Sequence, residues 1–301
     1  MFDFIADILG YCIRPIYHVV QNYGWTIILF TVFIKLVTLP LVVKSQKSMA
    51  KMQQVQPLIA ELQKKYKSNQ QKLNEEMSRI YQKYEISPLG GCLPMVVQLV
   101  VLFGFIQVVY RPLTYIAQIG ADKINEIAAA LGTQGGAGYQ EIVLCGNPAI
   151  NEEIVKLGLT PLNFDFFGIN LTQILQNNMT DWKMWIIPVL ALLLTFVSSY
   201  VTQKQQKAAA VQNAQASSMT KSMYIFMPIM TAWFSFTMPL GAALYWAIST
   251  FTQVVQQLLV QEFVVKKIPP LDIGKTKKKK PPVIVEAELS SEEEQAEEEE
   301  E

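Results

Sequence analysis

The chain of 301 residues carries little charge and a single histidine. Only 17% of its residues are charged, whereas soluble proteins have about 25%. Asp, Glu, Lys and Arg are absent from four stretches, which are 36–43, 86–110, 184–203 and 222–261. A helix needs roughly 20 apolar residues to cross the hydrocarbon core of a bilayer. The sequence therefore predicts a protein that crosses a membrane several times, and it argues against a soluble enzyme.

Residues that build metal centres and covalent catalysts are also scarce. The one histidine, His18, precedes the first long apolar stretch, and no serine lies in a nucleophile motif. Cys12, Cys92 and Cys145 are an odd number at unrelated spacings, which indicates neither a disulfide framework nor a metal site. The first residues lack the basic start and the cleavage site of a signal peptide. We expect no enzymatic activity, no metal, no cofactor and a retained N-terminal segment.

The charged residues balance in number but are segregated along the chain. Lys and Arg together number 25, as do Asp and Glu, so the net charge is zero. Nineteen of the basic residues lie in 44–85, 203–222 and 263–301. Basic segments beside membrane spans remain on the cytoplasmic side. The pattern predicts five spans, with the N-terminus outside and the C-terminus in the cytoplasm.

These patterns predict an all-α fold, with five transmembrane helices plus a cytoplasmic helical hairpin. The expected segments are an amphipathic interfacial helix at 1–21, transmembrane helices at 22–43, 88–110, 184–202, 223–238 and 242–261, the hairpin at 44–87, an external segment at 111–183, a cytoplasmic loop at 203–222 and a charged tail at 262–301.

Three segments outside the spans allow a more detailed expectation. In the hairpin, two apolar stripes favour antiparallel pairing, and Pro57 predicts a kink or a new helix start. Residues 162–175 are apolar enough to lie along the membrane surface. The tail carries a lysine run and a glutamate run and cannot bury a core, so its composition predicts disorder.

Lys35 is the residue that most needs an explanation, because it lies in the middle of the first span. Thr31 and Thr38 fall on the same helical face. A charge at the bilayer centre costs about 2.5–3.5 kcal/mol on insertion scales. Lys35 could snorkel to the inner surface, which lies about 12 Å away along the helix. We favour a hydrated cavity instead, because no Asp or Glu occurs in the other four spans to pair with Lys35.

Polar residues on the other spans would line the same cavity. Gln98 lies on the second span, and Ser249, Gln253 and Gln256 lie on one face of the fifth. Serine and threonine at such spacings also serve as packing contacts between helices. Burying a glutamine side chain costs more free energy than burying a serine or threonine. The expected hydrated groove therefore consists of Lys35, Thr31, Thr38, Gln98, Ser249, Gln253 and Gln256.

The chain resembles the YidC-type family of membrane protein insertases, a branch of the Oxa/Alb superfamily, over about residues 24–261. Several motifs in the family's order carry the resemblance. They are Gly24-Trp25, Ile34-Lys35-Leu36, Leu39-Pro40, Lys51-Met52, Gln56-Pro57, Lys65-Tyr66, Pro88, Gly91-Cys92-Leu93-Pro94, Gln98, Pro239, Leu244-Tyr245-Trp246 and Gln253. The length resembles family members without a large periplasmic domain.

The resemblance implies a bacterial plasma-membrane protein whose groove is closed to the outside and open to the cytoplasm and the lipid. Lys35 matches a position where the family typically has arginine. Unlike arginine, lysine can lose its proton when it is desolvated and cannot form a bidentate fork. The implied partners are nascent membrane proteins, lipid, the ribosome through the hairpin and the basic tail, and the Sec translocon.

Three functions are compatible with these features. The one we favour is an energy-independent membrane protein insertase and chaperone, which moves short hydrophilic client segments across the bilayer and releases their apolar segments into lipid. A transporter or channel for a small anion held by Lys35 is the alternative, although the inverted repeats typical of transporters are not visible. A passive scaffold that recruits ribosomes is the third.

Overall fold

The computed structural model describes residues 2–67, 69–87, 93–132, 140–156, 158, 161–207, 226 and 228–271. Met1–Pro269 form one compact unit, and the account below concerns this unit. Its main helices are α1 (Phe2–Val20), α2 (Tyr23–Lys65), α3 (Gln70–Lys83), α4 (Leu93–Tyr110), α5 (Pro112–Tyr115), α6 (Ala121–Ala130), α7 (Gln140–Cys145), α8 (Ile150–Lys156), α9 (Ile186–Lys207) and α11 (Leu240–Phe263). Residues 228–237 are also helical.

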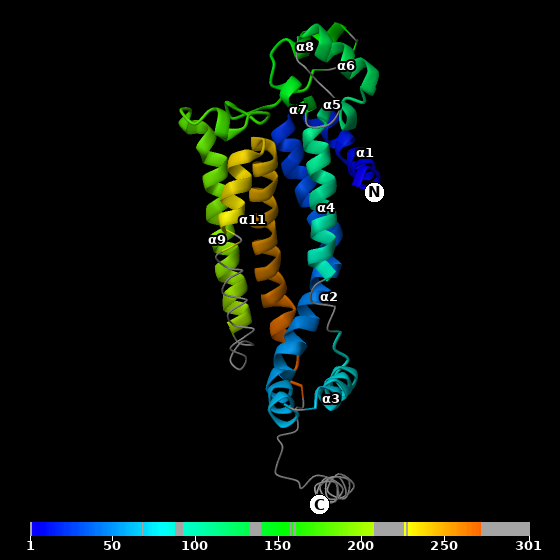
Figure 1. The fold of residues 1–301 in the computed structure, drawn as a ribbon, viewed down its shortest axis with the longest axis vertical. Coiled ribbons are helices and arrows are strands. Elements are labelled where there is room, and N and C mark those ends of the chain that lie inside the picture. The colour runs from blue at the N-terminus through cyan, green and yellow to red at the C-terminus, as the bar shows by residue number, and fades with distance from the viewer. Residues whose placement is uncertain are drawn as a thin grey trace, which may run out of the picture. The chain divides into compact units, whose positions relative to one another are not determined.

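Long apolar helices dominate the unit. Two helices of the described chain are long and apolar enough to cross a membrane, Tyr23–Lys65 and Trp182–Gln205, and Val96–Tyr110 is a shorter apolar helix. In Figure 1, α2, α4, α9 and α11 run side by side; α11 packs against α9 and α2, and α4 packs against α1 and α2. Large apolar side chains such as Phe33, Leu36 and Phe196 are exposed on these helices. The fold is that of a mostly helical membrane protein.

The helix α2 is continuous across two prolines. Pro40 and Pro57 both lie inside it, so the helix does not start anew at Pro57, which was one of the two expectations for this residue. Beyond Pro57, α2 packs against α3, and Ile59 and Leu73 are buried. The N-cap Asn69 starts α3 by accepting a hydrogen bond from Lys72 N.

A short antiparallel hairpin is the exception to the all-helical expectation. Strand β1 (Asp165–Phe166) pairs with β2 (Ile169–Asn170). Phe167 and Gly168 form the turn with φ values of 54° and 77°, and the Asp165 carboxylate accepts a hydrogen bond from Gly168 N. Two positive φ values are typical of the tight turns that connect twisted strands. Because phenylalanine seldom adopts such a φ value, this turn was not predicted from the sequence.

The segment around this hairpin covers the N-terminal ends of α2 and α11. Tyr23 N donates to Asn163 O, Leu240 N to Gln173 O, and Gly241 N to Leu171 O, all at 2.9 Å. The first N–H groups of a helix have no partner within the helix, so these carbonyl groups satisfy donors that would otherwise be left without a partner. Leu171 is fully buried. Residues 162–175 are therefore packed onto the helices, which the expectation of a segment along the membrane surface did not foresee.

The helix α1 is packed against the bundle through one stripe. Ala6, Leu9, Ile13 and Tyr17 are buried at spacings of three and four residues, against α4 and α2. Ile8 lies off this stripe and is 49% exposed. The helix turns Ala6 inward, and this small side chain allows a close approach to the neighbouring helices.

Parts of seven expected segments lie outside the described residues. They are residue 1 of the interfacial helix, 68 of the hairpin, 88–92 of the second span, 133–139, 157 and 159–160 of the external segment, 208–225 and 227 of the cytoplasmic loop and fourth span, and 272–301 of the tail. Within the described part, α9 extends to Lys207 and α11 to Phe263.

The close approach of Gly24 to Phe166 yields a stability prediction. A Cβ atom at residue 24 would lie 2.2 Å from Phe166 Cδ2 and 2.5 Å from Cγ. Gly24→Ala should therefore lower the free energy of unfolding by about 1–3 kcal/mol, the usual cost of overpacking. Thermal unfolding in detergent measures the loss. The control is Gly120→Ala, where no atom lies within 4 Å of the added Cβ. Phe166→Ala should restore stability to the Gly24→Ala variant, and no rescue would contradict the steric explanation.

A buried carboxylate where α5 meets α7 yields a pH prediction. Glu141 is 1% exposed and accepts hydrogen bonds from Thr114 N and Oγ1 at 2.9 and 2.6 Å. Burial raises its pKa, and the hydrogen bonds from Thr114 and the charge of Arg111 oppose that rise. Because the pKa of Glu141 is higher in the folded than in the unfolded protein, the protonated carboxyl group stabilises the fold. This contribution is complete below the unfolded pKa of 4.5. That stability is lost as the pH rises through the folded pKa.

Thermal midpoints from about pH 4 to about pH 8 test this linkage. The difference between wild type and Glu141→Gln should shrink as the pH rises, because glutamine does not ionise. The exposed Glu126→Gln on α6 serves as the control. A wild-type advantage that grew with pH would show that the pKa of Glu141 is lowered.

Candidate functional site

Lys35 lies on α2 and is 8% exposed, so its charge is inside the helix bundle. Its ammonium Nζ donates a hydrogen bond to Gln98 Oε1 at 2.9 Å. Within the described part of the chain, no carboxylate forms an ion pair with Lys35; the ion pairs found there involve Arg79, Arg111, Lys156 and Lys266. An ammonium group has three protons to donate. Lys35 is therefore a buried cation with capacity for further acceptors.

Gln98 connects this cation to α11. Its amide Nε2 donates to Tyr245 Oη and to Ser249 Oγ, both at 3.4 Å. Tyr245 and Ser249 are one helical turn apart, so both hydroxyl groups face α4 together. Because Nε2 is directed at these acceptors, the carbonyl oxygen of the same amide is directed at Lys35.

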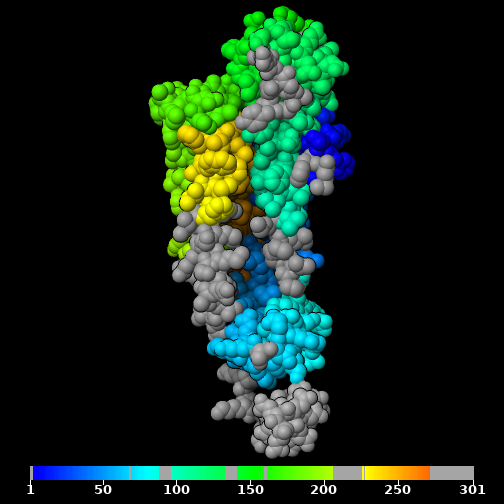
Figure 2. All heavy atoms as spheres, in the orientation of Figure 1, coloured from blue at the N-terminus to red at the C-terminus, as the bar shows by residue number. Residues whose placement is uncertain are grey.

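A second contact joins α11 to the backbone of α2 at the same level. Gln256 Nε2 donates to Lys35 O at 2.6 Å. We call Lys35, Gln98, Tyr245, Ser249 and Gln256 the Lys35 cluster. It brings together α2, α4 and α11. In Figure 2 a recess lies between α4 and residues 228–237, with α2 and α11 visible at its floor.

The remaining predicted residues do not reach the Lys35 ammonium group, although Thr38 Oγ1 lies 3.3 Å from the Lys35 carbonyl that Gln256 also contacts. Thr31 Oγ1 donates to Ile27 O at 2.7 Å and Thr38 Oγ1 to Ile34 O at 2.9 Å, so both hydroxyl groups bond within their own helix. Gln253 is exposed and makes no hydrogen bond to the cluster among the described residues. Four of the seven predicted groove residues thus meet around Lys35. Their role in binding clients remains a prediction.

Tyr245 was missed by the groove prediction. It is 4% exposed, and its ring stacks on Phe105 with centroids 4.1 Å apart, while Phe105 stacks on Phe30 at 5.3 Å. Sequence reasoning selected polar side chains and passed over aromatic ones. Tyr245 lies four residues before Ser249 and therefore on the same helical face, and this spacing was the signal in the sequence that could have identified it.

A second polar contact lies where the later part of α2 meets α9 and α11. Gln257 Nε2 donates to Gln205 Oε1 at 2.7 Å, and Gln53 Nε2 donates to Gln205 O at 3.3 Å. A cavity of about 100 Å³ lies among these side chains. Among the described residues that line it there is no lysine, arginine or carboxylate, so these residues offer only neutral donors and acceptors.

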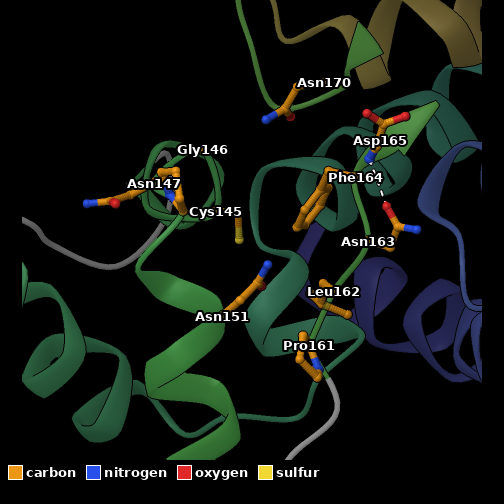
Figure 3. A pocket seen from close by; sticks show the side chains of 11 residues that line it. Cys145, Gly146, Asn147, Asn151, Pro161, Leu162, Asn163, Phe164, Asp165 and Asn170 are labelled. Atoms are coloured by element: carbon orange, nitrogen blue, oxygen red, sulfur yellow. Dashed lines mark hydrogen bonds between the residues drawn. The ribbon is translucent and has the colours of Figure 1, made fainter. Parts of the chain in front are cut away.

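A larger cavity of about 330 Å³ lies beside the β-hairpin, as Figure 3 shows. Four asparagines line it (Figure 3). The side-chain oxygens of three of them already accept backbone hydrogen bonds, Asn147 Oδ1 from Ala149 N, Asn163 Oδ1 from Asp165 N and Asn170 Oδ1 from Thr172 N. Cys145 also lines it, and burial raises the pKa of that thiol, so it remains protonated. The described residues contain no group of ligands suited to a metal ion.

Comparison with known proteins identifies the family. A family model described as 60Kd inner membrane protein matches residues 15–267. The chain belongs to this family. It is 30% identical over 257 residues to the membrane protein insertase YidC of Caldanaerobacter subterraneus subsp. tengcongensis, covering 85% of this chain and 93% of the relative. The resemblance to the YidC-type family is thereby confirmed.

Other YidC relatives are considerably longer. The chain is 33% identical over 251 residues to the membrane protein insertase YidC of Chlorobaculum tepidum, covering 82% of this chain but 35% of the relative. It is 48% identical over 106 residues to the protein of the same name from Nitratidesulfovibrio vulgaris, covering 35% of this chain and 20% of the relative. The family is one of bacterial inner membrane proteins, which agrees with the apolar helices.

The contact between Lys35 and Gln98 yields a prediction for a double-mutant cycle. Gln98→Leu should lower the free energy of unfolding by about 1.5–3 kcal/mol, because a buried charge loses its acceptor. In a Lys35→Met background the same change should cost much less, since no unpaired charge is left behind. Thermal unfolding measures all four proteins. Gln253→Leu is the matched control, since Gln253 is an exposed glutamine. Equal costs in both backgrounds would contradict the interaction.

Proposed function

We propose that the chain is a membrane protein insertase and chaperone, with the Lys35 cluster as the part that contacts its clients. The observation that carries the proposal is a cation 8% exposed among apolar helices, held by a neutral amide. A buried charge normally requires an opposite charge or water. A client that supplies acidic or polar groups would meet that requirement transiently.

In this proposal, five spans surround a groove that opens to the cytoplasm and to lipid, with the N-terminus outside and the C-terminus inside. Lys35 attracts an acidic or polar stretch of the client, and the groove hydrates that stretch partway across the bilayer. The apolar segment of the client then leaves sideways into lipid. Burial of each CH₂ group contributes about 0.8 kcal/mol, which drives release without an external energy source.

The remaining segments would serve the delivery of clients. We propose that the paired ends of α2 and α3 form a cytoplasmic hairpin. Its basic residues, together with those near the end of α11, would contact the ribosome, because clustered lysines attract phosphates. Nascent membrane proteins and lipid are the expected partners, and the Sec translocon is a further one. Residues 111–183 would cap the external side.

A transporter or channel for small anions is the second candidate function. It rests on the same feature, since Lys35 is a buried cation whose second and third protons remain for further acceptors. An anion could occupy the place that the first proposal assigns to client carboxylates. Solute flux and client insertion are separate measurements and can be made on the same purified protein.

Client insertion into liposomes by the purified chain, without ribosomes, tests the proposal. Lys35→Arg should retain insertion because the charge is kept. Lys35→Ala and Lys35→Glu should slow insertion by about tenfold or more, equivalent to ~1.4 kcal/mol in the barrier. Lys64→Glu is the control, because it reverses an exposed lysine on the same helix. Wild-type insertion by Lys35→Glu would refute the role of the charge, and anion flux without insertion would favour the transporter.

A further inference from the structure

Three stacked aromatic rings lie at one edge of the Lys35 cluster and share Tyr245 with it. Phe30 and Phe105 have ring centroids 5.3 Å apart at an interplanar angle of 16°, and Phe105 and Tyr245 lie 4.1 Å apart at 28°. The three exposed fractions are 0%, 0% and 4%. We call these residues the aromatic stack. It takes one ring from each of α2, α4 and α11, which are the helices that form the Lys35 cluster.

The aromatic stack lies on one side of the cluster on all three helices. Phe30 precedes Lys35 by five residues on α2, and Tyr245 precedes Ser249 by four on α11. Phe105 follows Gln98 by seven on α4, which runs the opposite way. On α2 and α11 the ring is therefore nearer the N-terminal end that the 161–173 segment covers, and on α4 it is nearer the C-terminal end, which lies on the same side in Figure 1. The stack separates the polar cluster from that covered end.

A second polar group lies beyond the stack on α2. The Tyr23 hydroxyl is buried and makes no hydrogen bond within the described chain. Buried hydroxyl groups are normally paired, with protein or with water. Tyr23 precedes Phe30 by two helical turns, which is about 10 Å. Tyr23 and Lys35, the two polar places on α2, are twelve residues apart, which is about 18 Å along the helix. Phe30 lies between them and carries the aromatic stack with Phe105 and Tyr245.

We propose that the aromatic stack is the seal of a latent anion pathway through this protein. This proposal rests on the groove of the proposed function, but not on client insertion itself. If the stack were removed, water would connect the Lys35 cluster with the region around the Tyr23 hydroxyl. The only formal charge in the cluster is positive, so the opened path would conduct small inorganic anions in preference to cations.

Halide uptake by liposomes that contain the purified full chain tests the seal. Phe105→Ala removes the central ring and should raise iodide uptake, read by quenching of an entrapped dye, on the order of tenfold over wild type, because a cleft of one charge concentrates counter-ions. Phe103→Ala is the matched control, since Phe103 lies on the same helix and is 46% exposed. It should remain as tight as wild type. If the Phe105→Ala protein folds but takes up iodide no faster than wild type, the proposal is overturned.

The selectivity of the leak tests the role of Lys35. In planar bilayers under a KCl gradient, the reversal potential of Phe105→Ala should shift toward the equilibrium potential of chloride. Adding Lys35→Gln should remove that preference while the leak persists. A cation-selective leak, or one unaffected by Lys35→Gln, overturns the proposal. If Phe105→Ala does not fold, Phe105→Val, which leaves a smaller gap, takes its place. The same uptake and selectivity results then support or overturn the proposal.

The outcomes remain separate from those of the proposed function. Normal insertion by Lys35→Glu would refute the client role and leave the flux comparison unchanged. Rapid iodide uptake by the wild-type protein would refute the seal and favour the anion transporter. Slow iodide uptake by wild type together with rapid uptake by Phe105→Ala supports the seal proposal, whichever function the Lys35 cluster serves.

Discussion

The hydrogen bond from Lys35 to Gln98 is the contact on which the arrangement of the central helices depends. A cation inside apolar helices is tolerated only where polar atoms are held towards it. Gln98 performs this role because Tyr245 and Ser249 orient its amide, and Gln256 ties α11 to the backbone at Lys35. Three helices are thus drawn around one charge, and the large apolar side chains on their other faces, such as Phe33, Leu36 and Phe251, are exposed where a bilayer would solvate them.

The covered ends of α2 and α11 are the second organising constraint. Helix N-termini offer N–H groups without partners, and water is not the solvent inside a membrane. Carbonyl groups of residues 163, 171 and 173 accept these donors, while the β-hairpin keeps the covering segment in register. The same cover buries Tyr23 and brings Phe166 against Gly24. Closure at this end therefore arises from ordinary backbone pairing rather than from a separate domain.

The client role proposed for the Lys35 cluster fits the kinds of side chain found there. Lysine presents a compact, rotatable charge, whereas arginine presents a rigid fork. A single amide oxygen is a suitable resting partner for such a point charge. The neutral contact of Gln53, Gln205 and Gln257 extends the polar surface along α2 and α11 without adding charge. Sequence-diverse clients would favour this combination of one charge with many neutral groups.

Local patterns in the sequence determined the helical class, the apolar segments, the family and four members of the Lys35 cluster. Charge-free runs and residue spacing carry that information, because burial along a helix is periodic. The continuity of α2 through Pro57, the Phe167–Gly168 turn and the packing of residues 162–175 were decided by tertiary contacts. Each depends on partners far along the chain, which no local pattern encodes. The same holds for Tyr245, whose hydroxyl matters only because α4 brings Gln98 to it and Phe105 fixes its ring.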